Sequence, residues 1–102
     1  MDLQGLFDQA REHHKQGNLP QAERLYRQLV QAAPGGFGAF YMLGVLQAQQ
    51  GRNAEALKNY QRAITLKPDF AEALYNNGML LWQMRRFPEA LAAFDRVLAQ
   101  AP

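Results

Sequence analysis

Residues 37–70 read FGAFYMLGVLQAQQGRNAEALKNYQRAITLKPDF. In this stretch, packing residues recur at the i, i+3, i+4, i+7 spacing of one helix face, first before Gly51 and again after it. The positions on the two faces are Phe40, Leu43, Gly44 and Gln47, and then Ala56, Tyr60, Ala63 and Ile64. Gly51 lies between them, where a helix ends and a left-handed backbone costs glycine least. The stretch therefore predicts two helices of about 12 to 14 residues joined by a tight turn.

The same pattern returns along the chain with a step of 34 residues. The positions that keep this step include Ala22, Ala56 and Ala90, then Tyr26, Tyr60 and Phe94, and the prolines Pro34, Pro68 and Pro102. Because each unit is predicted to be a helix pair, we predict one all-α domain over residues 1–102. Its three repeats are placed at approximately residues 3–36, 37–70 and 71–102.

Local signals at the predicted helix ends agree with this division. Pro20 and Pro88 fall in the first turn of a second helix, where a missing N–H costs nothing. Asp69, with Glu72 three residues later, predicts a capping box that opens the third repeat. Arg85 stands where the other two repeats have glycine, so a left-handed backbone there would cost about 1 kcal/mol, and we expect this turn to be shaped differently.

These residues resemble the motif of the tetratricopeptide repeat family: a large apolar residue, Leu-Gly and Tyr in one helix, Ala-x3-Phe in the next, and a final Pro. The second unit carries the motif as Phe40, Leu43-Gly44, Ala56-x3-Tyr60 and Pro68. The third carries it as Leu74, Asn77-Gly78, Leu81, Ala90-x3-Phe94 and Pro102, and the first as Leu6, Gln9-Ala10, His13, Ala22-x3-Tyr26 and Pro34. The chain departs from this motif at three positions: Gln47 and His13 stand where the motif has tyrosine, and Asn77 stands where it has leucine. The resemblance implies a right-handed α-solenoid of three helix-turn-helix repeats.

In this family, the first helices of successive repeats line a concave groove, which implies that this chain binds a peptide or protein partner there without catalysis. The groove positions implied for this chain are Phe7, Asp8, Arg11, His14, Tyr41, Met42, Val45, Glu72, Tyr75, Asn76, Met79 and Trp82. Tyr, Trp, Met and Arg are enriched at binding surfaces, so we expect a mainly apolar groove for a hydrophobic or amphipathic segment. The competing interpretation is that this aromatic and methionine stripe packs into the core.

Family members that bind chaperone C-termini hold the peptide carboxylate with basic and amide side chains. The matching positions here are Phe7, Arg11, Met42, Glu72 and Asn76. Only Arg11 and Asn76 suit that role, and Glu72 would repel a carboxylate. We therefore expect this clamp to be mostly absent.

The end of the chain leaves two further functions open. Solenoid arrays usually finish with a polar capping helix, and none follows the third repeat. We therefore expect Leu91 and Leu98 to be exposed and to support self-association into a homo-oligomer. The repeats then form either a self-assembling structural module or, if the natural chain is longer, the N-terminal scaffold of an enzyme such as a glycosyltransferase.

The sequence lacks the arrangements typical of catalysis. It has no cysteine and no serine, so disulfides, thiolate metal sites and a serine triad are excluded. His13 and His14 are neighbours on a predicted helix and point about 100° apart, so they cannot ligate one metal. The glycine-rich PGGFGAFY, residues 34–41, has neither the preceding strand nor the lysine of a phosphate loop. We predict no enzymatic activity, no cofactor and no metal site.

Composition narrows the class of partner. Hydrophobic residues make up 48% of the chain and charged residues 20%, which is typical of a globular protein. The net charge of +2 is spread along the chain, so we expect no nucleic-acid partner. No apolar stretch approaches the roughly 20 residues that span a bilayer, and the N-terminus has no secretory pattern. We expect no membrane insertion and a cytoplasmic location.

Overall fold

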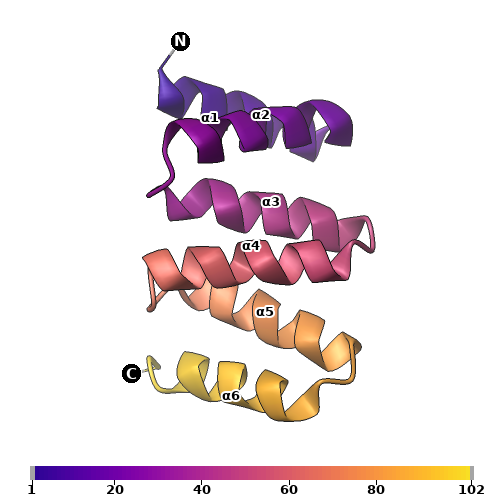
Figure 1. The fold of residues 1–102 in the computed structure, drawn as a ribbon, viewed down its shortest axis with the longest axis vertical. Helices are drawn as coiled ribbons and strands as arrows, with labels where there is room; N and C mark the ends of the chain where they lie inside the picture. The colour runs from indigo at the N-terminus through magenta and orange to yellow at the C-terminus, as the bar shows by residue number, and fades with distance from the viewer. Residues whose placement is uncertain (1, 102) are drawn as a thin grey trace.

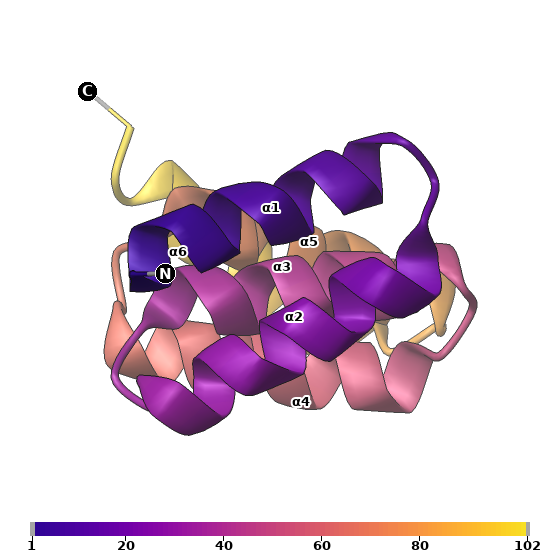
Figure 2. The same cartoon turned by 90° about the horizontal axis from the view of Figure 1, so that it is seen from above.

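The computed structural model describes residues 2–101, and its regular elements are six α-helices. The helices are α1 (Leu3–Lys15), α2 (Leu19–Ala32), α3 (Phe37–Gln49), α4 (Asn53–Leu66), α5 (Ala71–Gln83) and α6 (Phe87–Leu98). The chain runs from α1 and α2, which overlap at the top of Figure 1, down to α6 at the bottom, and in Figure 2 α1, α3 and α5 lie along one side with α2 and α4 along the other. The all-α repeat fold is therefore confirmed, while Pro102, the predicted end of the third repeat, lies outside the described residues.

The turn inside each helix pair has the same left-handed residue. Its φ is +81° at Gly17, +75° at Gly51 and +64° at Arg85. The residue after each of them donates its backbone N–H five residues back, for example from Arg86 to the carbonyl of Leu81 at 2.9 Å. Arg85 therefore adopts the left-handed conformation despite its cost, and the third turn keeps the shape of the other two, so the expectation of a differently shaped turn is wrong.

The helix starts predicted from proline are confirmed, whereas the predicted capping box is not. Pro20 and Pro88 lie in the first turns of α2 and α6, as predicted. The predicted capping box at Asp69 is wrong, because α5 begins at Ala71 with Phe70 as its N-cap and no side-chain capping bond among the described residues. The N–H of Phe70 closes the connector on the Lys67 carbonyl at 3.0 Å, which leaves Asp69 one residue too early to cap.

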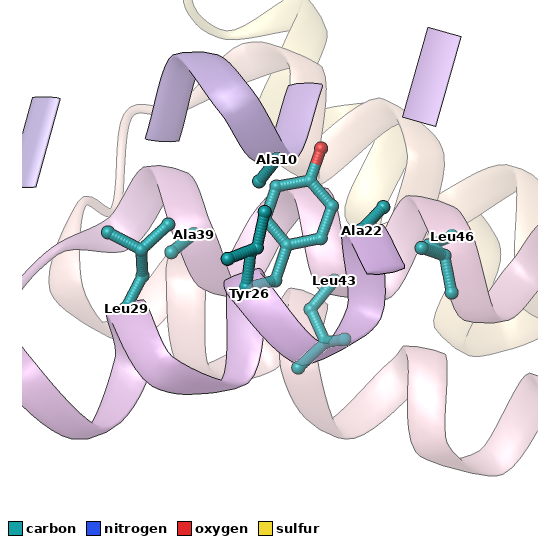
Figure 3. Packing of buried hydrophobic residues seen from close by; sticks show 8 residues of the cluster. Ala10, Ala22, Tyr26, Leu29, Ala39, Leu43 and Leu46 are labelled. Carbon is teal, nitrogen blue, oxygen red and sulfur yellow. The ribbon is translucent and has the colours of Figure 1, made fainter. Parts of the chain in front are cut away.

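The core of the first two repeats is built around the ring of Tyr26. This side chain is completely buried and lies among Ala10, Ala22 and Leu43 (Figure 3). The cluster draws residues from α1, α2 and α3, so the same ring holds the first repeat together and joins it to the second. Burial of this kind supplies most of the stability of short stacked helices.

The motif glycines are required by close packing within each repeat. A Cβ added to Gly44 would lie 2.8 Å from the Tyr60 ring, and one added to Gly78 would lie 2.7 Å from the Phe94 ring. Such distances are shorter than carbon atoms tolerate, so each glycine lets the second helix place an aromatic ring directly on the first. The same glycine–ring contact is thus repeated 34 residues later.

Two polar residues occupy motif positions that are normally apolar. Gln47 is buried, and its Oε1 accepts a hydrogen bond of 2.6 Å from Nδ2 of Asn59. Asn77 is also buried, but its Oδ1 finds no hydrogen-bond partner within residues 2–101. A buried polar atom without a partner costs about 1–3 kcal/mol, so Asn77 is a weak point in the core.

Replacing Asn77 by leucine should therefore stabilise the protein. The equivalent residue in α3 is the buried Leu43, which shows that this position accepts a leucine side chain. We expect the free energy of unfolding to rise by about 1–2 kcal/mol, because the unpaired oxygen is removed. Urea denaturation followed by circular dichroism measures it, with Asn76→Leu one residue earlier as the control. A less stable Asn77→Leu variant would show that the oxygen is satisfied in solution.

Candidate binding groove

A hollow of about 640 Å³ lies between α1 and α3, on the side formed by the first helices. The residues that line it are Asp8, Arg11, Glu12, His14 and Lys15 from α1, and Met42, Val45 and Gln49 from α3. Asp8, Arg11, Glu12 and Lys15 carry charges of both signs. α1 thus turns charged residues toward the hollow, while Met42 and Val45 of α3 give it apolar surface.

His14 forms one wall of the hollow and is held in place by two hydrogen bonds. Its Nδ1 lies 3.0 Å from the Tyr26 hydroxyl, and its Nε2 lies 2.7 Å from Oε1 of Gln49. Burial raises the pKa of Tyr26 to about 12. Because one ring nitrogen meets α2 and the other meets α3, this side chain links α1 to both helices.

Several predicted groove residues serve the packing of the helices. Phe7 meets Tyr26 edge-on at 6.3 Å between ring centroids and is half-buried against the first core cluster. Tyr41 packs on Phe70 at 4.9 Å, and its hydroxyl accepts a hydrogen bond of 2.9 Å from Asn76. Burial raises the pKa of Tyr41 as well. For Phe7 and Tyr41, the core interpretation describes the structure better than free exposure does.

Met42 and Val45 have an intermediate position. Both side chains are half-buried. Met42 packs against the core cluster around Tyr26, and Val45 packs against a second core cluster that includes Tyr60 and Leu80. Both also line the hollow between α1 and α3. They form an apolar floor beneath the charged side chains of α1.

The exposed apolar surface lies farther along, on α5. Tyr75, Met79 and Trp82 are 50%, 38% and 48% exposed, and their spacing places them in one row on this helix. The Trp82 ring meets Phe87 of α6 edge-on at 4.7 Å between centroids. We call Tyr75, Met79, Trp82 and Phe87 the α5 stripe.

Phe87 was missed by the sequence analysis because it belongs to a second helix, whereas only first helices were considered for the groove. The available signal was its position directly after the turn at Arg85, which brings the start of α6 back beside the end of α5. Its side chain is 37% exposed and extends the row of aromatic surface beyond Trp82.

The positions that match the carboxylate clamp do not converge on a free cationic site. The guanidinium of Arg11 lies over the Phe7 ring, 5.9 Å from its centroid. The amide of Asn76 donates a hydrogen bond to the Tyr41 hydroxyl, and Glu72 is exposed on α5.

The described residues hold no cluster of three or more His, Asp or Glu side chains that could bind a metal ion. None of the described helices is both long and apolar enough to cross a membrane.

Comparison with known families agrees with this geometry. A family model described as a tetratricopeptide repeat matches residues 7–69 and, in a second overlapping match, residues 49–102. The chain belongs to the tetratricopeptide repeat family. No curated protein matches the sequence.

Several solved structures share this fold over all or nearly all of the chain. The TPR domain of P58(IPK) shares 25% identity at a TM-score of 0.93, covering 100% of this chain and 28% of its own. The second TPR of Spaghetti (RPAP3), bound to the HSP90 peptide SRMEEVD, shares 19% identity at 0.91, covering 97% of this chain and 92% of its own. MamA shares 21% identity at 0.90, covering 96% of this chain and 57% of its own. This chain thus spans little more than half of MamA.

The last tetratricopeptide repeat leaves an apolar face of α6 exposed. Leu91 and Leu98 are 53% and 69% exposed, as predicted. The residues that precede them by 34 positions, Leu57 and Ile64, are only 5% and 8% exposed, because α5 covers them. The face of α6 that carries Leu91 and Leu98 therefore corresponds to a helix–helix interface elsewhere in the same chain.

Proposed function

We propose that this tetratricopeptide repeat module is a non-catalytic protein-interaction module that binds a partner segment along its first helices. The observation that carries the proposal is the α5 stripe, a continuous row of half-exposed aromatic and methionine side chains. Such residues dominate the energetics of binding surfaces when a partner buries them. We further propose that residues 3–36, 37–70 and 71–102 form three repeats, each of which adds its first helix to this surface.

The groove has two halves that suit different parts of one segment. The α5 stripe offers apolar surface, while the hollow between α1 and α3 offers Asp8, Arg11, Glu12 and Lys15 around Met42 and Val45. We infer that an amphipathic segment places its apolar side chains on the stripe and its charged side chains in the hollow. Charges of both signs at the hollow set orientation more than they add affinity.

Known relatives support a peptide as the ligand class. The second TPR of Spaghetti holds an HSP90 peptide in its structure, and that domain has the same fold as this chain. Tetratricopeptide repeats act generally as scaffolds for interactions, which favours binding over catalysis for this chain. The sequence of any partner is expected to differ from a carboxylate-terminated peptide, because Arg11 is the one cation among the clamp positions and Glu72 would repel a carboxylate.

Selection from a library of random peptides tests the proposal. We expect the selected peptides to carry aromatic or aliphatic residues at helical or extended spacing. Their binding should shift the backbone amide resonances of α5 and the side-chain resonance of Trp82. Binding that shifts only α2 and α4, on the opposite side, would contradict the proposed groove.

We propose a second surface, the exposed face of α6, for contact with a second copy of the chain. Leu91 and Leu98 repeat the positions of Leu57 and Ile64, which bury themselves against Leu80 and neighbouring residues of α5. The first helix cannot supply such a face, because Glu12 stands at the position of Leu80. The contact is therefore two-fold, α6 against α6, rather than head-to-tail.

Sedimentation at increasing protein concentration measures this association. We expect a monomer–dimer equilibrium that Leu91→Glu with Leu98→Glu abolishes, because both charges would be buried at the contact. Ala92→Glu is the matched control on the same helix, since the equivalent residues Arg24 and Lys58 are polar. A dimer that persists in the double variant would place the contact elsewhere, and a monomer at every concentration would refute it.

A further inference from the structure

A second pocket, of about 270 Å³, opens at the connector between α2 and α3. Its lining residues are Leu3, Gln4, Phe7, Leu29, Ala33, Gly36, Gly38 and Ala39. The connector lies beside the start of α1 in both Figure 1 and Figure 2. None of the described residues that line this pocket is charged, and Leu29 and Ala39 at its base belong to the core cluster of the first two repeats.

The second connector of the chain shows what fills the equivalent place there. Phe70 stands 34 positions after Gly36, and its ring meets Phe37 edge-on at 5.1 Å and Tyr41 at 4.9 Å between centroids. Phe37 and Tyr41 stand 34 positions after Leu3 and Phe7, which line the pocket. The pocket is therefore the place that a phenyl ring occupies one repeat later.

The two connectors have the same backbone, so the difference lies in the side chains. The N-cap residues Gly36 and Phe70 have φ/ψ of −83°/99° and −74°/93°. The N–H of Gly36 bonds to the Ala33 carbonyl at 2.9 Å, as that of Phe70 bonds to the Lys67 carbonyl at 3.0 Å. In the second connector the Lys67 ammonium also covers the Phe37 and Phe70 rings, at 4.9 and 5.6 Å, while the first has the small Ala33 there.

We propose that this pocket is a socket for the phenyl ring of a phenylalanine in a bound protein segment. The pocket exceeds the roughly 150 Å³ of an apolar cavity that holds benzene. Its walls are uncharged, which suits an uncharged ring, and Phe7 supplies an aromatic neighbour in the way that Tyr41 does for Phe70.

The socket continues an interface that is already packed. Leu29 and Ala39 join α2 to α3 in the core, and an inserted ring would extend that core outward by one side chain. A Cβ added to Gly38 would lie 3.6 Å from the Phe7 ring, so Phe7 and the start of α3 already form one wall of the socket. The socket lies between the first and second repeats, away from the α5 stripe, and its test does not depend on the stripe.

Methyl NMR with N-acetyl-phenylalanine amide as the probe tests the socket directly. We expect saturable shifts of the Leu3, Leu29 and Ala39 methyl resonances, with a dissociation constant on the order of millimolar for so small a probe. N-acetyl-leucine amide is the control ligand and should bind at least several-fold more weakly. No saturable shift at these methyls, or equal binding of the leucine probe, would overturn the proposal.

Two variants of the same residue separate filling of the socket from change of the backbone. Gly36→Phe should place a ring where Phe70 places one, raise the thermal midpoint, and weaken probe binding at least about tenfold. Gly36→Ala adds only a Cβ, which meets the Ala33 carbonyl oxygen at 3.3 Å, and should retain binding. Undiminished binding to Gly36→Phe would overturn the assignment.

Phe70→Gly provides a check that does not rely on the Gly36→Phe variant folding. It should open a second socket and add saturable shifts at the Ala63 and Ala73 methyls, which stand 34 positions after Leu29 and Ala39. Absence of these new shifts in the folded variant would contradict the equivalence of the two connectors. If dilution of the protein alone shifts the Leu29 and Ala39 methyls, a second copy occupies the socket, and the proposed occupant is wrong.

Discussion

Replacing Tyr26 by alanine is expected to lower the free energy of unfolding by about 3–5 kcal/mol. The side chain is completely buried among residues of α1, α2 and α3, so its removal leaves a cavity at the contact of the first two repeats. A domain of this size is stable by only about 5–15 kcal/mol, and the variant should therefore be close to unfolding at physiological temperature. Urea denaturation followed by circular dichroism measures the loss.

Tyr26→Phe is the matched control for this variant. It keeps the ring and removes only the hydroxyl that lies 3.0 Å from Nδ1 of His14, so we expect a loss of about 1 kcal/mol. If alanine and phenylalanine cost the same, the hydrogen bond to His14 rather than ring packing would hold this junction. If neither change costs stability, the first two repeats do not share the core described above.

Replacing Trp82 by alanine is expected to weaken binding of a selected peptide by about 2 kcal/mol or more, roughly thirtyfold. Its ring is 48% exposed on the α5 stripe and would be buried only when a partner covers it. The free energy of unfolding should change by about 1 kcal/mol or less, because the ring packs mainly on Phe87 at the surface. Isothermal titration calorimetry and urea denaturation measure the two quantities on the same variant.

Two controls make the Trp82 result specific. Trp82→Phe keeps an aromatic ring on the stripe and should retain most of the affinity. Lys58→Ala changes an exposed residue of α4, on the opposite side, and should leave affinity unchanged. A loss of stability of about 3–5 kcal/mol in Trp82→Ala would instead identify Trp82 as a core residue.

The sequence predicted the fold well because the features that define the repeat are local contacts. Gly44 packs against Tyr60 and Gly78 against Phe94, each inside a single helix hairpin, and the 34-residue step relates the first contact to the second. The capping box at Asp69 was wrong because the connector is closed by the backbone of Phe70, a bond that side-chain spacing does not reveal.

The groove was harder to predict because exposure depends on neighbours that come from other helices. Tyr41 and Tyr75 occupy the same motif position, but their surroundings differ. The ring of Tyr41 is covered by Phe70. The ring of Tyr75 lies 6.1 Å from that of Phe94, between centroids, and stays half-exposed. The charged hollow arises from α1, the most divergent first helix, whose outward residues follow no motif. The socket could not be predicted from the sequence, because it follows from the matching φ and ψ of Gly36 and Phe70.

Fluorescence emission of Trp82, the only tryptophan of the chain, tests the central claim that the α5 stripe is an open binding surface. We predict water-like emission from the free protein at every dilution, since the ring is half-exposed. Saturation with a selected peptide should shift the emission to the blue as the partner buries the ring. Blue-shifted emission from the free protein at every dilution, or emission that a saturating peptide leaves unchanged, would contradict the claim.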